Sequence, residues 1–421
     1  MSRLSRNLAI IAGAAGVLTY LGRREDMARR PIESIADAQR RAKRRIPGPI
    51  YKALISGNEK GVTIRDNVDA FSDIGWRPLV ARETYEEQPL DRDLSSTALG
   101  MDLSVPFMIG PAGAQAVDPR AEVAVAAAAK TVGTAIGLSS FATKPIEEVV
   151  AANPNALYQL YWTGSKDDIL WRMERAKAAG AKGLIITLDA TGGGLGRRDW
   201  DSPPVPAKID LEALIRFAPM ALSRPGWLAR FLFGGGIPDL AVPNSANGPG
   251  ENPPFSTIYA ELMQTQVPTW DDVKWLREEW GGKFVVKGIF RSDEARRAID
   301  IGADAIVVSN HGGNNLDSTY ASIRVLPAIA KAIGDQAEVW FDGGIRRGMD
   351  VAKALALGAD TVLLGRAWLW GLAAGGEKGV LDVLRMLEDG LHFALVGLGH
   401  RSINELSPDD IVAPEGFFIQ S

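Results

Sequence analysis

Residues 338–366 read EVWFDGGIRRGMDVAKALALGADTVLLGR, and this stretch holds two short apolar runs separated by a helical pattern. The runs EVWFDGG (338–344) and DTVLLGR (360–366) have continuous apolar centres, which are typical of parallel strands buried on both faces. The segment GMDVAKALALG between them has helical periodicity and ends at a glycine, as helices often do. The stretch therefore predicts one strand–helix–strand unit of a parallel sheet.

Similar runs recur along the chain and alternate with further helical patterns. The other six are SVPFMIG (104–110), TAIGLSS (134–140), ALYQLYW (156–162), KGLIITLD (182–189), KFVVKG (283–288) and DAIVVSN (304–310). Eight strand–helix units predict a closed (β/α)8 TIM barrel of the α/β class. A doubly wound sheet is the alternative fold, although such sheets usually have fewer strands.

The chain is long enough for one barrel with additions. We expect the barrel domain to span residues 31–421, with an N-terminal helix in IESIADAQRRAKRRI that covers its bottom or side. The connection at 190–268 is far longer than a normal loop and is rich in glycine and proline. Its position after the fourth strand fits a substrate lid, and a disordered surface insert is the alternative.

Residues 1–30 form a separate basic and apolar extension. The apolar stretch LAIIAGAAGVLTYL (8–21) is flanked by arginines, but it is shorter than the roughly 20 residues that a spanning helix needs. It predicts either a peripheral membrane contact or a frayed extension. We accordingly expect a cytoplasmic protein, with a peripheral position at the inner face of the membrane as the alternative.

Composition excludes several classes of function. A net charge of −4 and the absence of recognisable nucleic-acid-binding motifs argue against a nucleic-acid partner. The chain has no cysteine, so disulfides, thiolate metal sites and a cysteine nucleophile are excluded. The histidines also lack the ligand spacing of a metal site, and we predict no metal.

Polar residues stand at or just after the predicted strands, where barrel enzymes carry their active sites. Two glycine-rich turns, DGGIRRG (342–348) and GRA (365–367), follow the last two strands. Glycine lets the backbone approach a ligand, and Arg346 and Arg366 can each bind phosphate oxygens in a bidentate manner. These turns predict a phosphate site, unless they are ordinary turns with surface arginines.

His311 and Lys287 are the two residues that most suggest catalysis. His311 follows an apolar strand in VVSNHGGNNLD, and a carboxylate such as Asp189 beside it would stabilise its cationic form and make it a general base. Lys287 lies inside the apolar run FVVKGI, where a lysine must meet an anion or lose its charge. The other two histidines, His392 and His400, lie in or near a C-terminal helix and are interpreted as structural.

The chain resembles the FMN-dependent α-hydroxy acid oxidases and dehydrogenases from about residue 50 to 411. The resemblance rests on SGNEKGVTIRDNVDAFSDIGWRP, GLSSFATKPIEEV, YQLYW, ITLD, VVKGI, SNHGG, FDGGIRRGMDVAKALALGA and LLGRA. It implies that FMN is the cofactor, and that the flavin contacts are Pro111, Ala112, Gly113, Ser139, Gln159, Thr187 and Lys287. It places the phosphate at Asp342, Gly344, Arg346, Gly365 and Arg366, and assigns substrate chemistry to Tyr161, Asp189 and His311, with Lys287 stabilising the reduced flavin.

The same resemblance implies that the substrate is not an ordinary hydroxy acid. Asn314 stands where the family has an arginine that binds the substrate carboxylate, Asn315 follows it, and Ala53 replaces a second carboxylate contact. A further family arginine falls at Arg197 or Arg198. The pattern SNHGGNNLD is most similar to the mycofactocin-biosynthesis branch of the family, which implies oxidative deamination of a peptide-derived amino-lactam.

These residues leave three functions open. The first is amino-lactam oxidation, in which Asn314 and Asn315 bind the neutral substrate. The second is a 2-hydroxy acid (L-lactate-type) dehydrogenase in which Arg198 binds the carboxylate, and the third is a catalytically silent flavin-binding maturation protein. The resemblance further implies oxygen or another electron acceptor, and a homo-oligomer of the tetrameric kind.

Overall fold

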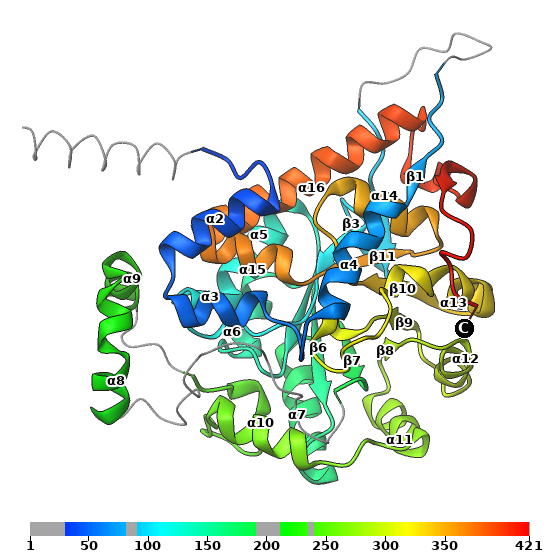
Figure 1. Ribbon diagram of the computed structural model, residues 1–421. Coiled ribbons are helices and arrows are strands. Elements are labelled where there is room, and N and C mark those ends of the chain that lie inside the picture. Colours follow the sequence, from blue (N-terminus) through cyan, green and yellow to red (C-terminus); the bar gives the residue numbers. More distant parts are fainter. Residues whose placement is uncertain (1–29, 81–90, 191–210, 235–239, 421) are drawn as a thin grey trace, which may run out of the picture.

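Eight parallel strands form a closed barrel at the centre of the computed structural model, which describes residues 30–80, 91–190, 211–234 and 240–420 (Figure 1). The order around the barrel is β10-β11-β4-β5-β6-β7-β8-β9, and every neighbouring pair is parallel. The strands are β4 (Phe107–Ile109), β5 (Ile136–Ser139), β6 (Ala156–Tyr161), β7 (Gly183–Thr187), β8 (Lys283–Ile289), β9 (Ala305–Val308), β10 (Glu338–Asp342) and β11 (Thr361–Leu364). All eight predicted strands and the predicted TIM barrel are confirmed.

The barrel interior is packed with side chains and closed at its N-terminal end. Met108, Ile185 and Trp340 belong to one fully buried interior cluster. A hairpin of β2 (Ser96–Ala98) and β3 (Met101–Leu103) contributes to the same cluster. Because this end is plugged, a ligand has access only from the opposite end, where the strands terminate.

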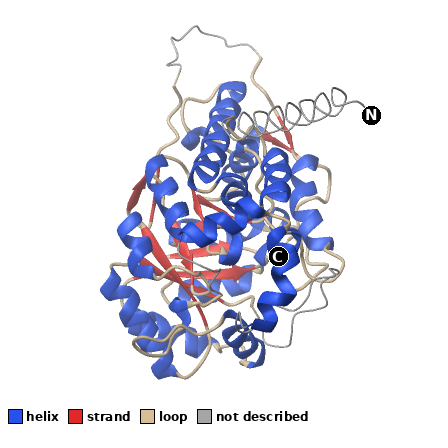
Figure 2. Cartoon of the chain, turned by 90° about the vertical axis from the view of Figure 1, so that its left-hand side faces the viewer, coloured by secondary structure: helices blue, strands red, loops and turns tan. Residues whose placement is uncertain are grey.

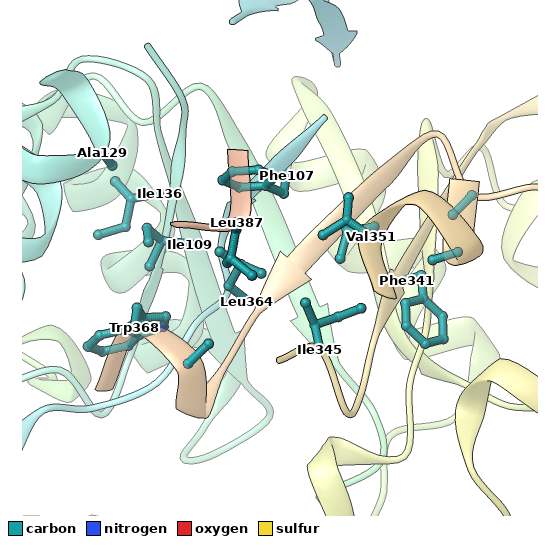
Figure 3. Packing of buried hydrophobic residues seen from close by; sticks show 14 of the residues in the cluster. Phe107, Ile109, Ala129, Ile136, Phe341, Ile345, Val351, Leu364, Trp368 and Leu387 are labelled. Atoms are coloured by element: carbon teal, nitrogen blue, oxygen red, sulfur yellow. The ribbon is translucent and has the colours of Figure 1, made fainter. Parts of the chain in front are cut away.

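Helices surround the strands as an outer layer (Figure 2). One helix of this layer follows each strand before the next begins, or closes the ring after β11: α5 (Ala121–Val132), α6 (Ile146–Ala152), α7 (Lys166–Ala179), α11 (Trp270–Trp280), α12 (Ser292–Asp300), α13 (Leu326–Ile333), α14 (Gly348–Ala356) and α15 (Arg366–Gly375). Their inner faces bury apolar side chains against the strands in one continuous core, part of which is shown in Figure 3. Each apolar side chain so buried contributes about 1.5–3 kcal/mol to stability.

The N-terminal and C-terminal segments pack on one side of the barrel. The predicted N-terminal helix is α2 (Ile35–Arg45), which begins at the capping residue Ser34 and packs against α15 and the long helix α16 (Glu377–Leu398). The sequence predicted that this region covers the bottom or side of the barrel. That holds for α2, but α3 (Gly48–Ile55) and α4 (Val62–Asp73) continue to the open end, where α4 contacts the turn at His311.

The insertion contains three helices in its described part. They are α8 (Leu211–Leu222), α9 (Pro225–Gly234) and α10 (Phe255–Gln264). Between α9 and α10, Asn244 attaches the insertion to the barrel: its Oδ1 accepts from the Ile146 amide at 2.9 Å and its Nδ2 donates to the Lys144 carbonyl at 2.9 Å. The Tyr158 hydroxyl donates to the Asn244 carbonyl at 2.6 Å, so this attachment is buried and fully hydrogen-bonded.

We predict that Asn244→Ala lowers the free energy of unfolding by about 1–3 kcal/mol, because it leaves a buried amide and a buried carbonyl without partners. Chemical denaturation measures this loss, and limited proteolysis of the insertion should speed up in the same variant. Asn247→Ala is the control, since Asn247 is exposed in the same loop. Equal stability of the two variants would contradict the anchoring role.

Candidate functional site

A cavity of about 1090 Å³ opens at the C-terminal ends of the strands. Most of the predicted site residues line it, and they come from seven separate segments: Pro111, Ala112, Gly113, Ser139, Tyr161, Lys287, His311, Asn314, Asn315, Asp342, Gly344, Arg346, Gly365 and Arg366. Gln159, Thr187 and Asp189 lie immediately behind this lining, beside Ser139, Lys287 and His311 respectively. Arg197 and Arg198 lie outside the described residues.

The insertion and α3 supply an apolar cover for the cavity. Its residues are Ile50, Ala53, Leu54, Phe217, Met220, Trp227, Leu228, Phe255, Leu262 and Met263. Phe255 and Tyr259 stack one helical turn apart with ring centroids 5.5 Å apart, and Phe141 contacts both rings. The insertion therefore covers the site, as expected of a lid. These aromatic residues were not predicted from the sequence, although the spacing of Phe255 and Tyr259 on one helix face was a usable signal.

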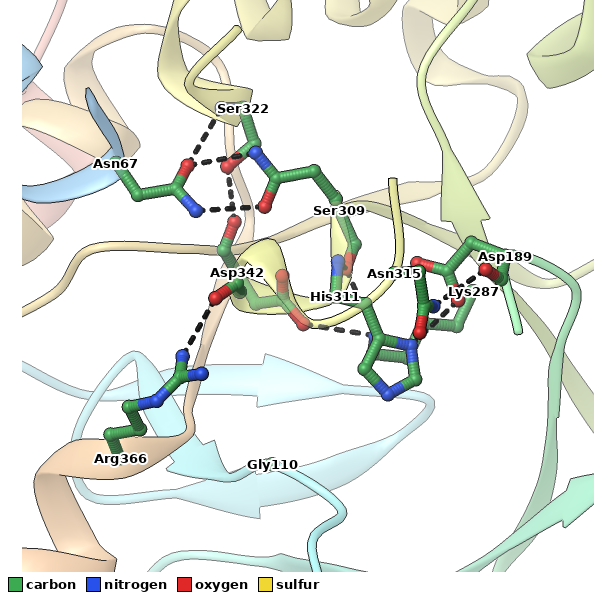
Figure 4. Close-up of polar contacts among 12 residues, drawn as sticks. Asn67, Gly110, Asp189, Lys287, Ser309, His311, Asn315, Ser322, Asp342 and Arg366 are labelled. Carbon is green, nitrogen blue, oxygen red and sulfur yellow. Dashed lines mark hydrogen bonds and ion pairs between the residues drawn. The ribbon is translucent and has the colours of Figure 1, made fainter. Parts of the chain in front are cut away.

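His311 lies between a carboxylate and a phenol. Its Nδ1 is 2.8 Å from Asp189 Oδ1 (Figure 4). Its Nε2 is 3.3 Å from the Tyr161 hydroxyl. A carboxylate on Nδ1 fixes the proton there, which leaves Nε2 as the basic nitrogen facing the cavity. The arrangement predicted for His311 and Asp189 from the sequence is present in the structure.

Burial and charge keep both neighbours of His311 in defined protonation states. Burial raises the pKa of Asp189, but the nearby His311 and Lys287 outweigh it, so this pKa lies below its usual value. Burial, together with Asp189 and Tyr259, raises the pKa of Tyr161 well above its usual value. Asp189 is therefore a carboxylate and Tyr161 a neutral hydrogen-bond donor at neutral pH.

Lys287 meets a carboxylate of the protein itself. Its Nζ is 3.2 Å from Asp342 Oδ2 and donates to Ser309 Oγ at 2.9 Å, and its side chain is 5% exposed. Burial lowers the pKa of Lys287, but Asp342 and Asp189 more than offset this, and the net pKa is raised. The lysine is thus a buried cation. The resemblance implied that Asp342 holds the phosphate, whereas in the structure Asp342 is the ion-pair partner of Lys287.

Two unpaired polar atoms fit the flavin ring system. Gln159 Nε2 and Thr187 Oγ1 are buried without a hydrogen-bond partner among the described residues. Gln159 Oε1 accepts from Ser139 Oγ at 3.1 Å, and this bond leaves the amide nitrogen free. Buried polar groups are rarely left unpaired in a functional protein, so these donors match a ligand with carbonyl and ring-nitrogen acceptors, as FMN has.

The predicted phosphate loops also fit a terminal phosphate. Gly344 has φ +78°, and no atom lies within 4 Å of where a Cβ on Gly365 would be, at the start of α15. Arg346 lines the same part of the cavity, and burial, only partly opposed by Asp350, lowers its pKa to about 10. A half-buried guanidinium with this pKa is stabilised by an anion, which a phosphate group would provide.

Arg366 is already hydrogen-bonded to the protein. Its guanidinium donates to the carbonyls of Leu54, Ser56 and Gly312 at 3.0, 2.9 and 2.7 Å, and to Asn314 Oδ1 at 2.9 Å. Arg366 therefore joins α3 to the loop of His311, and a phosphate contact would be additional to these bonds. Because Arg366 binds the oxygen of Asn314, the amide nitrogen of Asn314 is left to face the cavity.

The remaining histidines and Asn315 have structural contacts. Asn315 Nδ2 donates to the backbone carbonyl of Asp189 at 2.6 Å, so it holds the backbone of the residue whose carboxylate pairs with His311. His392 lies within α16, and His400 Nε2 is 3.0 Å from both carboxylate oxygens of Asp410, away from the cavity. The interpretation of His392 and His400 as structural agrees with these positions.

Comparison with known proteins identifies the family. A model described as FMN-dependent dehydrogenase matches residues 42–413. This chain belongs to the FMN-dependent dehydrogenase family. It is 54% identical over 391 residues to the pre-mycofactocin synthase of Mycobacterium tuberculosis (strain CDC 1551 / Oshkosh), which covers 93% of this chain and 97% of that protein.

More distant relatives oxidise hydroxy acids, by their names. The L-lactate dehydrogenase of Pseudomonas putida (strain W619) is 34% identical over 390 residues, covering 91% of this chain and 99% of that protein. Among solved structures, a monotopic membrane protein, (S)-mandelate dehydrogenase, has a TM-score of 0.77 at 30% identity, covering 91% of this chain and 100% of its own. This family member is thus an FMN-dependent oxidoreductase that uses a small-molecule substrate and an electron acceptor.

We predict that Arg346→Gln weakens FMN binding, because it removes a charge-assisted hydrogen bond worth about 1.5–3 kcal/mol, or roughly 10- to 150-fold in Kd. Titration of the apoprotein with FMN, followed by flavin fluorescence, measures the change. Arg347→Gln is the matched control, because Arg347 is the exposed neighbour and pairs with Asp350. If both variants bind FMN as tightly as the parent, Arg346 does not hold the phosphate.

Proposed function

We propose that this enzyme oxidises the carbon that bears an amine next to a neutral lactam carbonyl, and so deaminates a peptide-derived amino-lactam. The observation that carries the proposal is the amide of Asn314. Arg366 holds its oxygen at 2.9 Å, which leaves Nδ2 as a neutral donor toward the cavity. The identity of 54% to a pre-mycofactocin synthase supports the same substrate class.

A neutral donor at this position suits a lactam better than a carboxylate. The amide can bond a lactam carbonyl without leaving a buried charge uncompensated. A carboxylate substrate would instead need a cation, and the nearby guanidinium of Arg366 is already engaged by three carbonyls and Asn314. Much of the remaining cover is apolar, which also disfavours a small anionic substrate.

The described side chains suffice for the proton chemistry of this reaction. The bound flavin supplies the acceptor for the two electrons and the hydrogen that leave the substrate carbon. His311 Nε2 accepts the proton that the substrate nitrogen loses as the C=N bond of an imine forms, and Asp189 Oδ1, 2.8 Å from Nδ1, stabilises the imidazolium. Water then hydrolyses the imine to a ketone and releases ammonia, which completes the deamination. The Tyr161 hydroxyl, 3.3 Å from Nε2, donates a hydrogen bond to the substrate heteroatom. The buried Lys287 cation would stabilise the negative charge of the reduced flavin.

Two other functions make different predictions. A 2-hydroxy acid dehydrogenase would reduce its flavin with L-lactate, and a silent flavin-binding maturation protein would not reduce it with any amine or hydroxy acid. Oxygen as the acceptor and a homo-oligomeric, tetrameric state are further parts of the proposal, and both rest on resemblance to the family.

We predict that a 3-amino-2-pyrrolidinone-type lactam reduces the flavin faster than L-lactate does, and that Asn314→Arg reverses this preference. The new guanidinium should raise the lactate rate roughly 10- to 150-fold, since it adds a charge-assisted bond to the carboxylate. Stopped-flow absorbance of the flavin measures both rates.

Asn314→Gln is the matched control, because it keeps a neutral amide and should keep the lactam preference. If the parent enzyme reduces its flavin faster with lactate than with the lactam, the hydroxy-acid function replaces the proposed one. If neither substrate nor a wider panel of amines and hydroxy acids reduces the flavin, the maturation-protein alternative is favoured.

We further propose a peripheral contact with an anionic membrane. The part of the chain that the structure describes has no helix long and apolar enough to span a bilayer. The pair α8 and α9, however, exposes Ile215, Leu222, Leu232 and Phe233, the last with 92% of its surface accessible. Residues 215–234 also contain three arginines and no carboxylate, which is typical of helices that lie on a membrane surface. Residues 1–29, whose contact was predicted from the sequence, lie outside the described part.

We predict that vesicles with anionic lipids sediment this protein, and that Leu232→Ser/Phe233→Ser lowers the bound fraction. The loss of two inserted apolar side chains should weaken binding roughly 10-fold or more. Phe393→Ser is the matched control, since Phe393 is also exposed but lies on α16. If the parent protein and both variants sediment equally, α9 does not contact the membrane.

A further inference from the structure

Asn67 on α4 and Asn310, directly before His311, form a reciprocal amide pair. Asn67 Nδ2 donates to Asn310 Oδ1 at 2.8 Å, and Asn310 Nδ2 donates to Asn67 Oδ1 at 2.9 Å. Figure 4 shows Asn67 beside Ser322 and above Asp342. The two side chains are 2% and 8% exposed. A buried pair of this kind fixes the orientation of both amides, because flipping either one would set donor against donor.

The asparagine pair lies next to a residue, His311, whose backbone conformation is constrained. His311 has φ +55°, in the left-handed region that side chains other than glycine adopt only when the surroundings hold them. Asn310 Nδ2 also donates to the Tyr320 carbonyl at 2.9 Å, and Asn67 Oδ1 accepts from the Ser322 amide at 3.3 Å. Asn67 thus fixes both ends of the loop that carries His311.

The same residue contacts the loop predicted to bind phosphate. A Cβ on Gly344 would lie 1.7 Å from the Asn67 carbonyl oxygen, so the chain at Gly344 packs directly on the backbone of Asn67. Ser322, which donates its amide to Asn67, also donates its hydroxyl to the Asp342 carbonyl at 2.5 Å. The spacing between the histidine loop and the cofactor loop is therefore set at one point of α4.

We propose that Asn67 is a positioning residue for the reaction: through its reciprocal pair with Asn310 it holds His311 in the left-handed conformation that aims Nε2 at the substrate. The inference rests on the proposed role of His311 as the base. Asn67 touches neither substrate nor flavin and acts through the His311 backbone. Gly344 packs on the Asn67 backbone, which side-chain substitutions keep, so their effect is on the rate of proton transfer more than on cofactor binding.

Thr63 provides a matched control on the same helix. It is fully buried, and its hydroxyl donates to the Thr319 carbonyl at 2.9 Å, in the same loop but away from His311. Thr63→Val removes that bond at nearly constant volume, as Asn67→Leu removes the amide pair. If α4 only supports folding, the two variants will behave alike.

The test compares these variants as FMN-loaded proteins, with selective ¹³C labelling of histidine. The chain has only three histidines, so the ring resonances of His311 are resolved once His311→Ala has assigned them. We expect Asn67→Leu to shift the His311 resonances and to slow flavin reduction by the lactam roughly 10- to 100-fold, with FMN retained, because small misplacements of a catalytic group cost that much. Thr63→Val should lower the melting temperature without either effect.

A second variant covers the case in which Asn67→Leu does not fold. Asn67→Asp keeps the acceptor for Asn310 and Ser322 but sets a carboxylate oxygen against Asn310 Oδ1 in place of the donor, and it should shift the same resonances. Unmoved resonances and an unchanged reduction rate in the folded Asn67 variants would overturn the inference, as would equal losses in Thr63→Val. The resonances need no substrate, so they still decide the role of Asn67 if the lactam fails to reduce the parent flavin and the proposed function falls.

Discussion

Closure of the barrel between β11 and β4 is the constraint on which the rest of the structure depends. Their paired residues are 255 positions apart in sequence, and the register is parallel from Val362 with Phe107 to Leu364 with Ile109. Once the ring is closed, the ends of all eight strands meet at one rim. Lys287 Nζ donates to Ser309 Oγ and pairs with Asp342, which lies at the end of another strand. The same Ser309 Oγ accepts from the backbone amide of His311, directly after β9.

The charges at this rim are balanced in three different ways. Lys287 is neutralised by Asp342, and Arg366 is satisfied by backbone carbonyls and Asn314. Arg346 has a smaller share of protein partners, with Nη1 donating to the Ile345 carbonyl and Asp350 nearby. Of these cations it therefore has the most to gain from an external anion, which is consistent with a cofactor that ends in a phosphate.

The sequence predicted the strands and the central acid–base pair well, for a physical reason. Strand positions follow from local apolar patterning, and His311 and Asp189 follow from the rule that strand ends converge. Hydrogen bonds and ion pairs between individual side chains could not be predicted from the sequence. The bond from Arg366 to Asn314 and the pairing of Asp342 with Lys287 depend on side-chain rotamers, and no periodicity encodes them.

The contribution of the N-terminal region to the site was the largest feature that the sequence did not predict. Asn67 and Asn310 are separated by 243 residues, and nothing in either local sequence indicates that the two amides meet. The same holds for α3, whose Ile50 and Leu54 line the cavity although sequence analysis placed the region at the bottom or side of the barrel. Long-range packing of this sort is fixed only when the whole chain has folded.

The attachment of the insertion at Asn244 has an evolutionary consequence. The segment that covers the cavity enters and leaves the barrel within a single connection, between β7 and α11, and it is hydrogen-bonded to the β5 and β6 units through a few buried groups. Substitutions in α8 or α10 can therefore reshape the apolar cover of the cavity while the strand ends beneath stay as they are. The cover and the charged residues of the rim are thus two separate parts of the site, and sequence change can accumulate in the first without disturbing the second.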